Sequence, residues 1–178
     1  MKIIFLLIIF VFSFTSLAFA GIDHAQLSLL KGDYDAVIRN CDLAIKSNSS
    51  SAQAYYLKGI AMLKKSRYNE AQVLFDKILA DFSGSIFADI SLVRLGDISF
   101  YEGDFDTAIG RYRKLQEKFP KSELMAHVIY KLGKSCIKAN RMQESRFYFQ
   151  KLQQDFPASF ESKFIDEMDD SEFAYSVQ

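Results

Sequence analysis

The side chains that could do chemistry in this chain are few and lie far apart in the sequence. Its two histidines, His24 and His127, belong to no His-Glu-x-x-His or similar metal-binding motif. Its two cysteines, Cys41 and Cys136, have neither zinc-ligand spacing nor the signature of a nucleophile. No Gly-x-x-x-x-Gly-Lys loop is present to hold a phosphate. The sequence therefore predicts no catalytic residues, no metal site and no cofactor.

Charged residues give no sign of a site either. Acidic pairs such as Asp33/Asp35 and Asp104/Asp106 fall in turn-like segments, where capping of a helix is the expected role. The chain has 22 basic and 22 acidic residues. A nucleic-acid partner would require a strongly basic face, so this balance argues against one.

A fixed interval organises the chain instead. Gly59, Gly96 and Gly133 are 37 residues apart, and each is followed twelve residues later by a small residue and sixteen later by an aromatic one. The small residues are Ala71, Ala108 and Ser145, and the aromatic ones are Phe75, Tyr112 and Phe149. A weaker copy at Gly32 has Val37 and Cys41 in these two slots. Such an interval predicts a repeat array.

Each repeat must be a pair of helices. Only a small residue fits where two helices cross closely, and the aromatic residue is expected to fill space between neighbouring repeats. Pro120 and Pro157 should end the second helix of a pair, because proline lacks a backbone N–H. The serines that follow each second helix are placed to cap the next one; they are Ser85, Ser122 and Ser159. A compact four-helix bundle would not require this interval to recur.

The pattern resembles the tetratricopeptide repeat. Leu95-Gly96 and Leu132-Gly133 match its Leu-Gly pair, and Tyr55 matches its opening aromatic residue. Lys58 before Gly59 and Ser83 at an expected proline depart from it. The resemblance implies an all-α, right-handed superhelical solenoid of about four helix-turn-helix repeats with a C-terminal capping helix. The expected boundaries are a signal peptide at 1–20, a repeat domain at 21–168 (repeats about 21–51, 52–88, 89–125 and 126–159, capping helix about 160–168) and an acidic, disordered tail at 169–178.

The first twenty residues indicate export. Lys2 precedes the apolar run Ile3–Phe12, and Ala18-Phe19-Ala20 forms a small-x-small site before Gly21. This order is typical of a cleaved secretory signal peptide, and an uncleaved membrane anchor is the alternative. A lipoprotein would need a cysteine just after the cleavage site, and the first cysteine is Cys41, so a lipoprotein is not expected. The expected location is periplasmic or secreted, without stable membrane insertion after cleavage.

Export makes disulfides possible. Repeats of a solenoid touch only their neighbours, so Cys41 and Cys136 should be too far apart to bridge. Both are expected to be buried apolar residues. An intermolecular disulfide through Cys41 stays open as an alternative.

The resemblance also implies a binding groove lined by the first helix of each repeat. Carried over through the glycine register, its candidate residues are Tyr56, Lys64, Asp97, Tyr101, His127, Tyr130, Lys134 and Lys138. Aromatic rings and lysines together could hold an acidic-aromatic segment or a terminal carboxylate. The alternative is that the lysines keep this face soluble and the aromatic rings pack between helices.

Among exported proteins, the 37-residue spacing resembles the repeat domain of two periplasmic groups. These are the outer-membrane assembly lipoprotein (BamD-like) and the Tol-associated cell-division coordinator (YbgF/CpoB-like). The resemblance implies a non-enzymatic adaptor that binds a partner protein or peptide in the bacterial envelope through its concave groove. The alternative is a structural module that self-associates through its solenoid ends.

Overall fold

The computed structural model describes residues 21–47 and 51–166 of the chain. The chain divides into two compact units, Met1–Ala88 and Asp89–Gln178, and each is described by itself. The expected signal peptide, the last residues of the expected capping helix and the expected acidic tail lie outside the described residues. Within the described ranges the regular structure is entirely helical.

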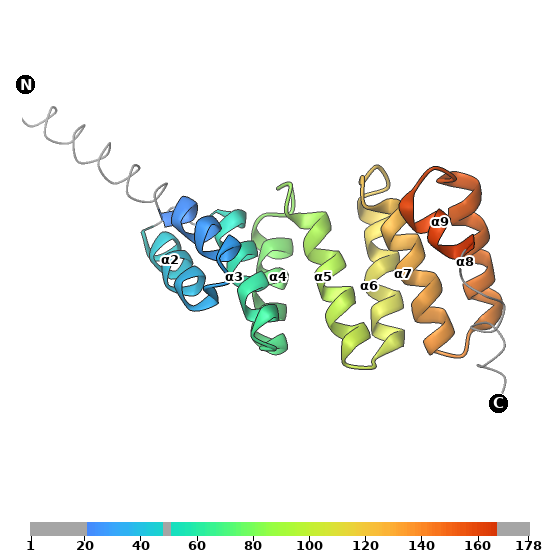
Figure 1. Cartoon of the computed structure of the whole chain (residues 1–178), viewed down its shortest axis with the longest axis horizontal. Helices are drawn as coiled ribbons and strands as arrows, with labels where there is room; N and C mark the ends of the chain where they lie inside the picture. Colours follow the sequence, from blue (N-terminus) through green and yellow to red (C-terminus); the bar gives the residue numbers. More distant parts are fainter. Residues whose placement is uncertain (1–20, 48–50, 167–178) are drawn as a thin grey trace, which may run out of the picture. The chain divides into compact units, whose positions relative to one another are not determined.

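Among its described residues, 21–47 and 51–88, the first unit contains four helical segments (Figure 1). Residues 21–30 form the first, followed by α2 (Tyr34–Lys46), α3 (Ala52–Lys64) and α4 (Tyr68–Asp81). Helix α2 packs against α3, and α3 packs against α4. A core of Ala25, Val37, Cys41, Leu57 and Ala61 joins the first three segments.

The second unit begins one residue into α5 (Ala88–Tyr101). It continues with α6 (Phe105–Lys118), α7 (Met125–Lys138), α8 (Met142–Asp155) and the short α9 (Phe160–Asp166). Helix α7 packs against α6, α8 and α9. These antiparallel pairs with a short terminal helix confirm the all-α repeat fold that the sequence predicts.

The glycine and the aromatic residue sixteen positions later are in direct contact in each of these three helix pairs. A Cβ atom on Gly59 would lie 2.7 Å from Cε1 of Phe75, and Gly96 and Gly133 lie closer still to Tyr112 and Phe149. Each aromatic ring therefore lies against the glycine of its own helix pair, whereas we expected it between neighbouring repeats. The reason is that glycine has no Cβ atom, so the ring can approach the backbone of the first helix closely only at that position.

The first helix pair solves the same contact differently. Ala25 and Cys41 have the same separation of sixteen residues, and both are completely buried in one cluster. Alanine has the Cβ atom that glycine lacks, so less space remains for its partner, and a small cysteine occupies the aromatic slot.

The turn inside each helix pair has one residue with left-handed backbone angles. These residues are Gly32, Ser66, Gly103 and Asn140, with φ values of 73°, 58°, 81° and 58°. In each turn the next backbone N–H donates to the carbonyl five residues earlier, as in Arg67 to Met62 at 2.9 Å. Glycine and asparagine are common in this position, while serine is unusual.

The capping serines behave as expected at only one helix. The backbone N–H of Ser162 donates to Oγ of Ser159 at 3.1 Å, so Ser159 caps α9. Ser85 and Ser122 instead accept from residues two positions later, Phe87 and Leu124, and α5 and α7 begin further on. A short turn follows these two serines, which makes that prediction wrong by about one turn.

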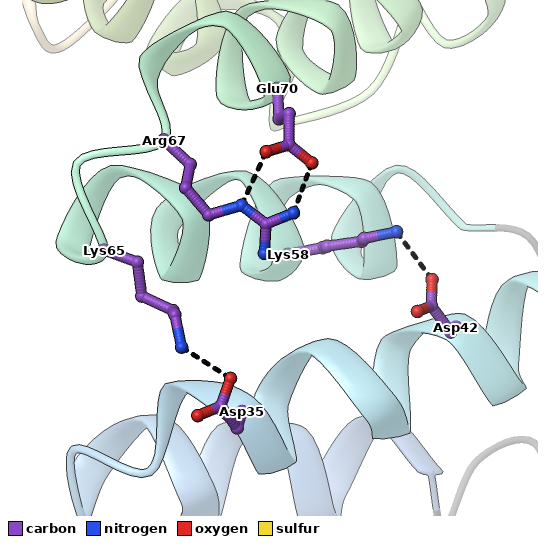
Figure 2. A network of polar contacts seen from close by, with 6 residues as sticks. All are labelled: Asp35, Asp42, Lys58, Lys65, Arg67 and Glu70. Carbon is purple, nitrogen blue, oxygen red and sulfur yellow. Dashed lines mark hydrogen bonds and ion pairs between the residues drawn. The ribbon is translucent and has the colours of Figure 1, made fainter.

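Ion pairs join α2 to α3 in the first unit (Figure 2). Lys58 Nζ lies 2.6 Å from Asp42 Oδ1, and Lys65 Nζ lies 2.6 Å from Asp35 Oδ1. The hydrogen bond from Lys65 lowers the pKa of Asp35. All four side chains are at least partly exposed, so these pairs orient the helices more than they stabilise them.

Cys41 and Cys136 are free and buried, as expected from the sequence. Burial raises the pKa of the Cys41 thiol to about 12 and that of Cys136 to about 11. A thiol that stays protonated is a poor nucleophile, so neither cysteine is suited to catalysis.

Candidate functional site

The candidate residues of the first unit lie on α3. The ring of Tyr56 is half-buried, with its centroid 5.2 Å from that of Phe87 and 6.0 Å from that of Phe75. Lys64 is exposed at the end of the helix. The geometry thus makes Tyr56 a packing residue with one accessible side and leaves Lys64 at the surface.

Asp97 lies in a buried polar cluster of the second unit. Its side chain is nearly inaccessible, accepts a hydrogen bond from Tyr112 Oη at 2.9 Å, and pairs with Lys131 Nζ at 2.9 Å. Arg94 donates to its other oxygen at 3.3 Å. Asp97 was expected on the open groove, but here it supplies an acceptor for the hydroxyl of Tyr112 and joins α5 to α6 and α7.

Burial and the neighbouring Asp97 carboxylate raise the pKa of Tyr112. Its hydroxyl therefore stays protonated and donates. Phe75 and Phe149 occupy the same slot in their helix pairs and need no such partner. The cluster is explained by one polar aromatic residue in a buried position.

Two aromatic residues follow Asp97 at the end of α5. Tyr101 is 69% exposed, and its ring meets that of Phe100 edge-on, with centroids 6.2 Å apart. Lys131 Nζ lies 5.9 Å from the centroid of Phe100. Of the sequence-predicted residues on α5, Tyr101 is accessible to a partner and Asp97 is not.

His127 and Tyr130 on α7 both contact residues of the terminal helix α9. His127 Nδ1 lies 3.3 Å from Glu161 Oε1, and the ring centroids of Tyr130 and Phe164 are 6.1 Å apart. Tyr130 also contacts Phe149 at 6.1 Å. The chain's own helix therefore covers part of the surface that the sequence assigns to a ligand.

Lys134 and Lys138 extend the same stripe toward the C-terminal end of α7. Residues 127, 130, 134 and 138 are spaced by three or four positions, so they lie on one face of the helix. Lys134 is half-buried and Lys138 is exposed. The contacts given between α9 and α7 involve His127 and Tyr130, and none involves these two lysines.

A cavity of about 330 Å³ opens where α5, the start of α7 and α9 meet. Half of its lining residues are apolar and half are charged or polar; they are Ile90, Val93, Arg94, Glu123, Leu124, Ala126, His127 and Glu161. His127 was predicted as a groove residue, whereas Arg94, Glu123 and Glu161 were not. Glu161 could have been found by placing the expected capping helix in register with α7.

The lining and its surroundings show which ligands the described residues can hold. Among residues 21–47 and 51–166, no group of three or more His, Cys, Asp or Glu side chains is placed to hold a metal ion. The cavity combines apolar side chains with a few charged groups, the composition that ligand pockets generally have. Within the same described ranges, no helix has the length and apolar character to cross a bilayer.

The comparisons agree with this geometry. Residues 91–122 and 127–159 match the family model of the tetratricopeptide repeat. The crystal structure of PilW, a widely conserved type IV pilus biogenesis factor, is similar with a TM-score of 0.71 at 18% identity. The match covers 83% of this chain and 66% of that of PilW, so this chain spans about two thirds of its length.

Two structures of MamA are also similar. MamA from Desulfovibrio magneticus RS-1 has a TM-score of 0.68 at 18% identity, covering 90% of this chain and 93% of the other. MamA MSR-1 has a TM-score of 0.58 at 19% identity, with 82% and 78% covered. No curated protein sequence matches the chain. At these identities the likeness shows the fold alone.

Proposed function

We propose that this tetratricopeptide-repeat chain is an exported, non-enzymatic adaptor that holds a partner protein in the bacterial envelope. Proteins with this repeat bind protein or peptide partners and are usually scaffolds without catalysis. The expected signal peptide and the resemblance to the BamD-like and YbgF/CpoB-like repeat domains support export and the envelope. PilW, the similar pilus biogenesis factor, is consistent with a role in envelope assembly.

The observation that carries the proposal is the cavity between α5, α7 and α9. Ile90, Val93 and Leu124 contribute apolar side chains to its lining, and Arg94 and Glu123 contribute charged ones. It lies on the face to which the repeat register assigns a ligand. A peptide side chain that enters it can bury apolar surface against the apolar lining residues and place a polar group near the charged ones.

Site-specific photo-crosslinking tests the proposal. A benzoyl-phenylalanine at Ile90, in the cavity wall, is expected to capture one discrete partner from envelope extract. The matched control carries the same group at Phe147, which is 61% exposed on α8. Equal capture from both positions, or none from Ile90, would mean that the cavity does not bind a partner.

Self-association is a second candidate, and one observation favours it. Leu30 in the first helical segment and Leu43 in α2 are 86% and 65% exposed. Exposed leucines at the first helix pair could pack against another copy. In this case light scattering shows an oligomer that the double substitution Leu30→Lys/Leu43→Lys dissociates. A monomer at all concentrations would exclude it.

A further inference from the structure

The cavity between α5, α7 and α9 is small enough to select a single side chain. Its volume of about 330 Å³ is at the lower end of the roughly 300–1,000 Å³ that ligand pockets occupy. A folded segment of a partner would not fit, whereas one long side chain would. Ile90, Val93 and Leu124 offer aliphatic surface in the lining, against which a chain of methylene groups can pack.

The charged side chains of the lining are more acidic than basic. Glu123 and Glu161 are opposed by Arg94, which leaves the lining a net charge of −1 (two negative, one positive, counting the histidine as neutral). Arg94 pairs with Asp97 at 3.3 Å. Asp97 also pairs with Lys131 at 2.9 Å, and these two opposite charges add nothing to the sum. The cavity therefore suits a cation better than an anion.

Glu123 supplies a carboxylate that is open to a partner. It immediately precedes Leu124, the N-cap residue of α7, and it is exposed. Among residues 21–47 and 51–166 its side chain forms no ion pair and no hydrogen bond. A basic group that approaches it therefore does not have to break a contact within the described chain.

Glu161 supplies a second carboxylate, from α9. Its side chain is 21% exposed, and Oε1 lies 3.3 Å from Nδ1 of His127. A carboxylate accepts hydrogen bonds at both oxygens, so this contact leaves acceptor capacity for a ligand. A cation in the cavity can thus interact with acidic groups from two elements, α9 and the start of α7.

We propose that the cavity takes a basic side chain, lysine or arginine, of the partner protein, with its methylene stem against the three aliphatic residues and its charge at the two glutamates. This inference rests on the proposed function and specifies which kind of partner residue enters the cavity. The apolar contact supplies most of the affinity and the charges supply the selectivity, because partly exposed ion pairs are weak. The acidic segment that the sequence predicts at Lys134 and Lys138 is a separate ligand, since neither lysine lines the cavity.

Methyl NMR of the full chain tests the charge preference. The probes are N-acetyl-lysine N-methylamide, the norleucine compound, which has a similar methylene stem and no ammonium group, and the glutamate compound. The lysine compound should shift the methyl signals of Ile90, Val93 and Leu124. It should bind at least about threefold more tightly than the other two, the ratio of a partly exposed ion pair. The methyl signals of Ile109, which is buried on α6, should not move.

Variants of the two glutamates test which groups recognise the charge. Glu123→Gln and Glu161→Gln should each reduce the preference for the lysine compound and keep the response to the norleucine compound. Glutamine at position 161 retains an acceptor for His127, so α9 keeps this contact. The matched control is Glu117→Gln, at an exposed glutamate on α6, which should leave the preference unchanged. Unshifted Ile109 signals show that each variant is folded.

Three results would overturn the inference. Equal affinity for the lysine and norleucine compounds would mean that the cavity does not recognise charge. Tighter binding of the glutamate compound would mean that the lining favours an anion. No change in the three sets of methyl signals with any compound would mean that the cavity takes no side chain.

Photo-crosslinking separates this inference from the proposed function. With benzoyl-phenylalanine at Ile90, the added substitution Glu123→Lys should lower the capture of the partner at least about threefold, and Glu117→Lys should not. Capture that Glu123→Lys leaves unchanged would retain the adaptor function and reject the basic side chain. A preference for the lysine compound without any capture at Ile90 would support the cation site and reject the proposed partner at the cavity.

Discussion

Gly59 and Phe75 touch so closely that a single added carbon atom would not fit between them. A Cβ on Gly59 would lie 2.7 Å from Cε1 and 2.8 Å from Cζ of the ring. The same contact recurs between Gly96 and Tyr112 and between Gly133 and Phe149, while Ala25 and Cys41 replace it in the first helix pair. The spacing in the sequence is therefore the record of one physical contact.

Gly59→Ala is expected to destabilise the protein by about 1–3 kcal/mol, because the buried Phe75 ring must shift in a packed core. Helix propensity favours alanine by up to about 1 kcal/mol, so the net loss falls in the lower part of this range. Urea unfolding followed by circular dichroism measures it. The control is Gly110→Ala on α6, where a Cβ would meet no atom within 4 Å and should stabilise the helix.

The Ala25/Cys41 pair suggests a compensating substitution. Phe75→Cys alone leaves a cavity and should cost about 3–5 kcal/mol, similar to Phe→Ala. In the double variant Gly59→Ala/Phe75→Cys the new Cβ meets the smaller side chain. The loss of stability in the double variant should therefore be smaller, by at least about 1 kcal/mol, than the sum of the losses in the two single variants. Strict additivity in this double-mutant cycle would mean that the first helix pair follows another packing rule.

The spacing of the glycine, the small residue and the aromatic residue was enough to predict the helix pairs, because the contact between the two helices restricts which residue type fits at each of these positions. Ser66 gave no signal, since serine carries no preference for left-handed angles. The burial of Asp97 depends on the hydroxyl of Tyr112, a relation across two helices that a list of groove positions does not include. The cover over His127 and Tyr130 depends on the register of α9, which the sequence indicates only as an amphipathic segment. Ligand binding by the remaining groove residues stays a prediction.

Tyr112→Phe removes the hydroxyl that donates to Asp97. The carboxylate keeps Lys131 at 2.9 Å but loses one buried hydrogen bond, so a loss of about 1–2 kcal/mol is expected. Thermal unfolding with Asp97→Asn as the second arm measures it. The double variant should be only slightly less stable than Asp97→Asn alone. A full additional loss would show that the two groups act independently.

Ser66→Gly should stabilise the protein by up to about 1 kcal/mol, because Ser66 has a φ of 58° and glycine adopts this conformation without steric cost. The matched substitution Asn140→Gly, at the same φ, should gain less, since asparagine tolerates left-handed angles better. Midpoints in urea rank the two. If Ser66→Gly lowers the stability, the Ser66 side chain stabilises the fold by more than its left-handed backbone angles destabilise it.

The N-cap of α6 makes stability depend on pH. Hydrogen bonds from the hydroxyl and the backbone N–H of Thr107 lower the pKa of Asp104 from its ordinary 3.8, and the backbone bond is 3.1 Å long. A lowered folded pKa gives stability that is present above the unfolded value and is lost as pH falls through the folded one. The advantage of the unchanged chain over Asp104→Asn should therefore shrink between about pH 5 and pH 3.

Phe164 is one of the residues through which α9 contacts α7. Phe164 is 43% exposed and contacts Tyr130, whereas Phe160 is 77% exposed and stacks on Phe164 at 6.2 Å. Phe164→Ala should therefore raise amide hydrogen exchange across residues 160–166 and cost about 1 kcal/mol, in proportion to the apolar area it buries. Phe160→Ala removes only the outer ring and should leave exchange in α9 nearly unchanged. If both substitutions release α9 equally, the contact with Tyr130 does not hold the helix, and its position must come from Ile165, which is 8% exposed.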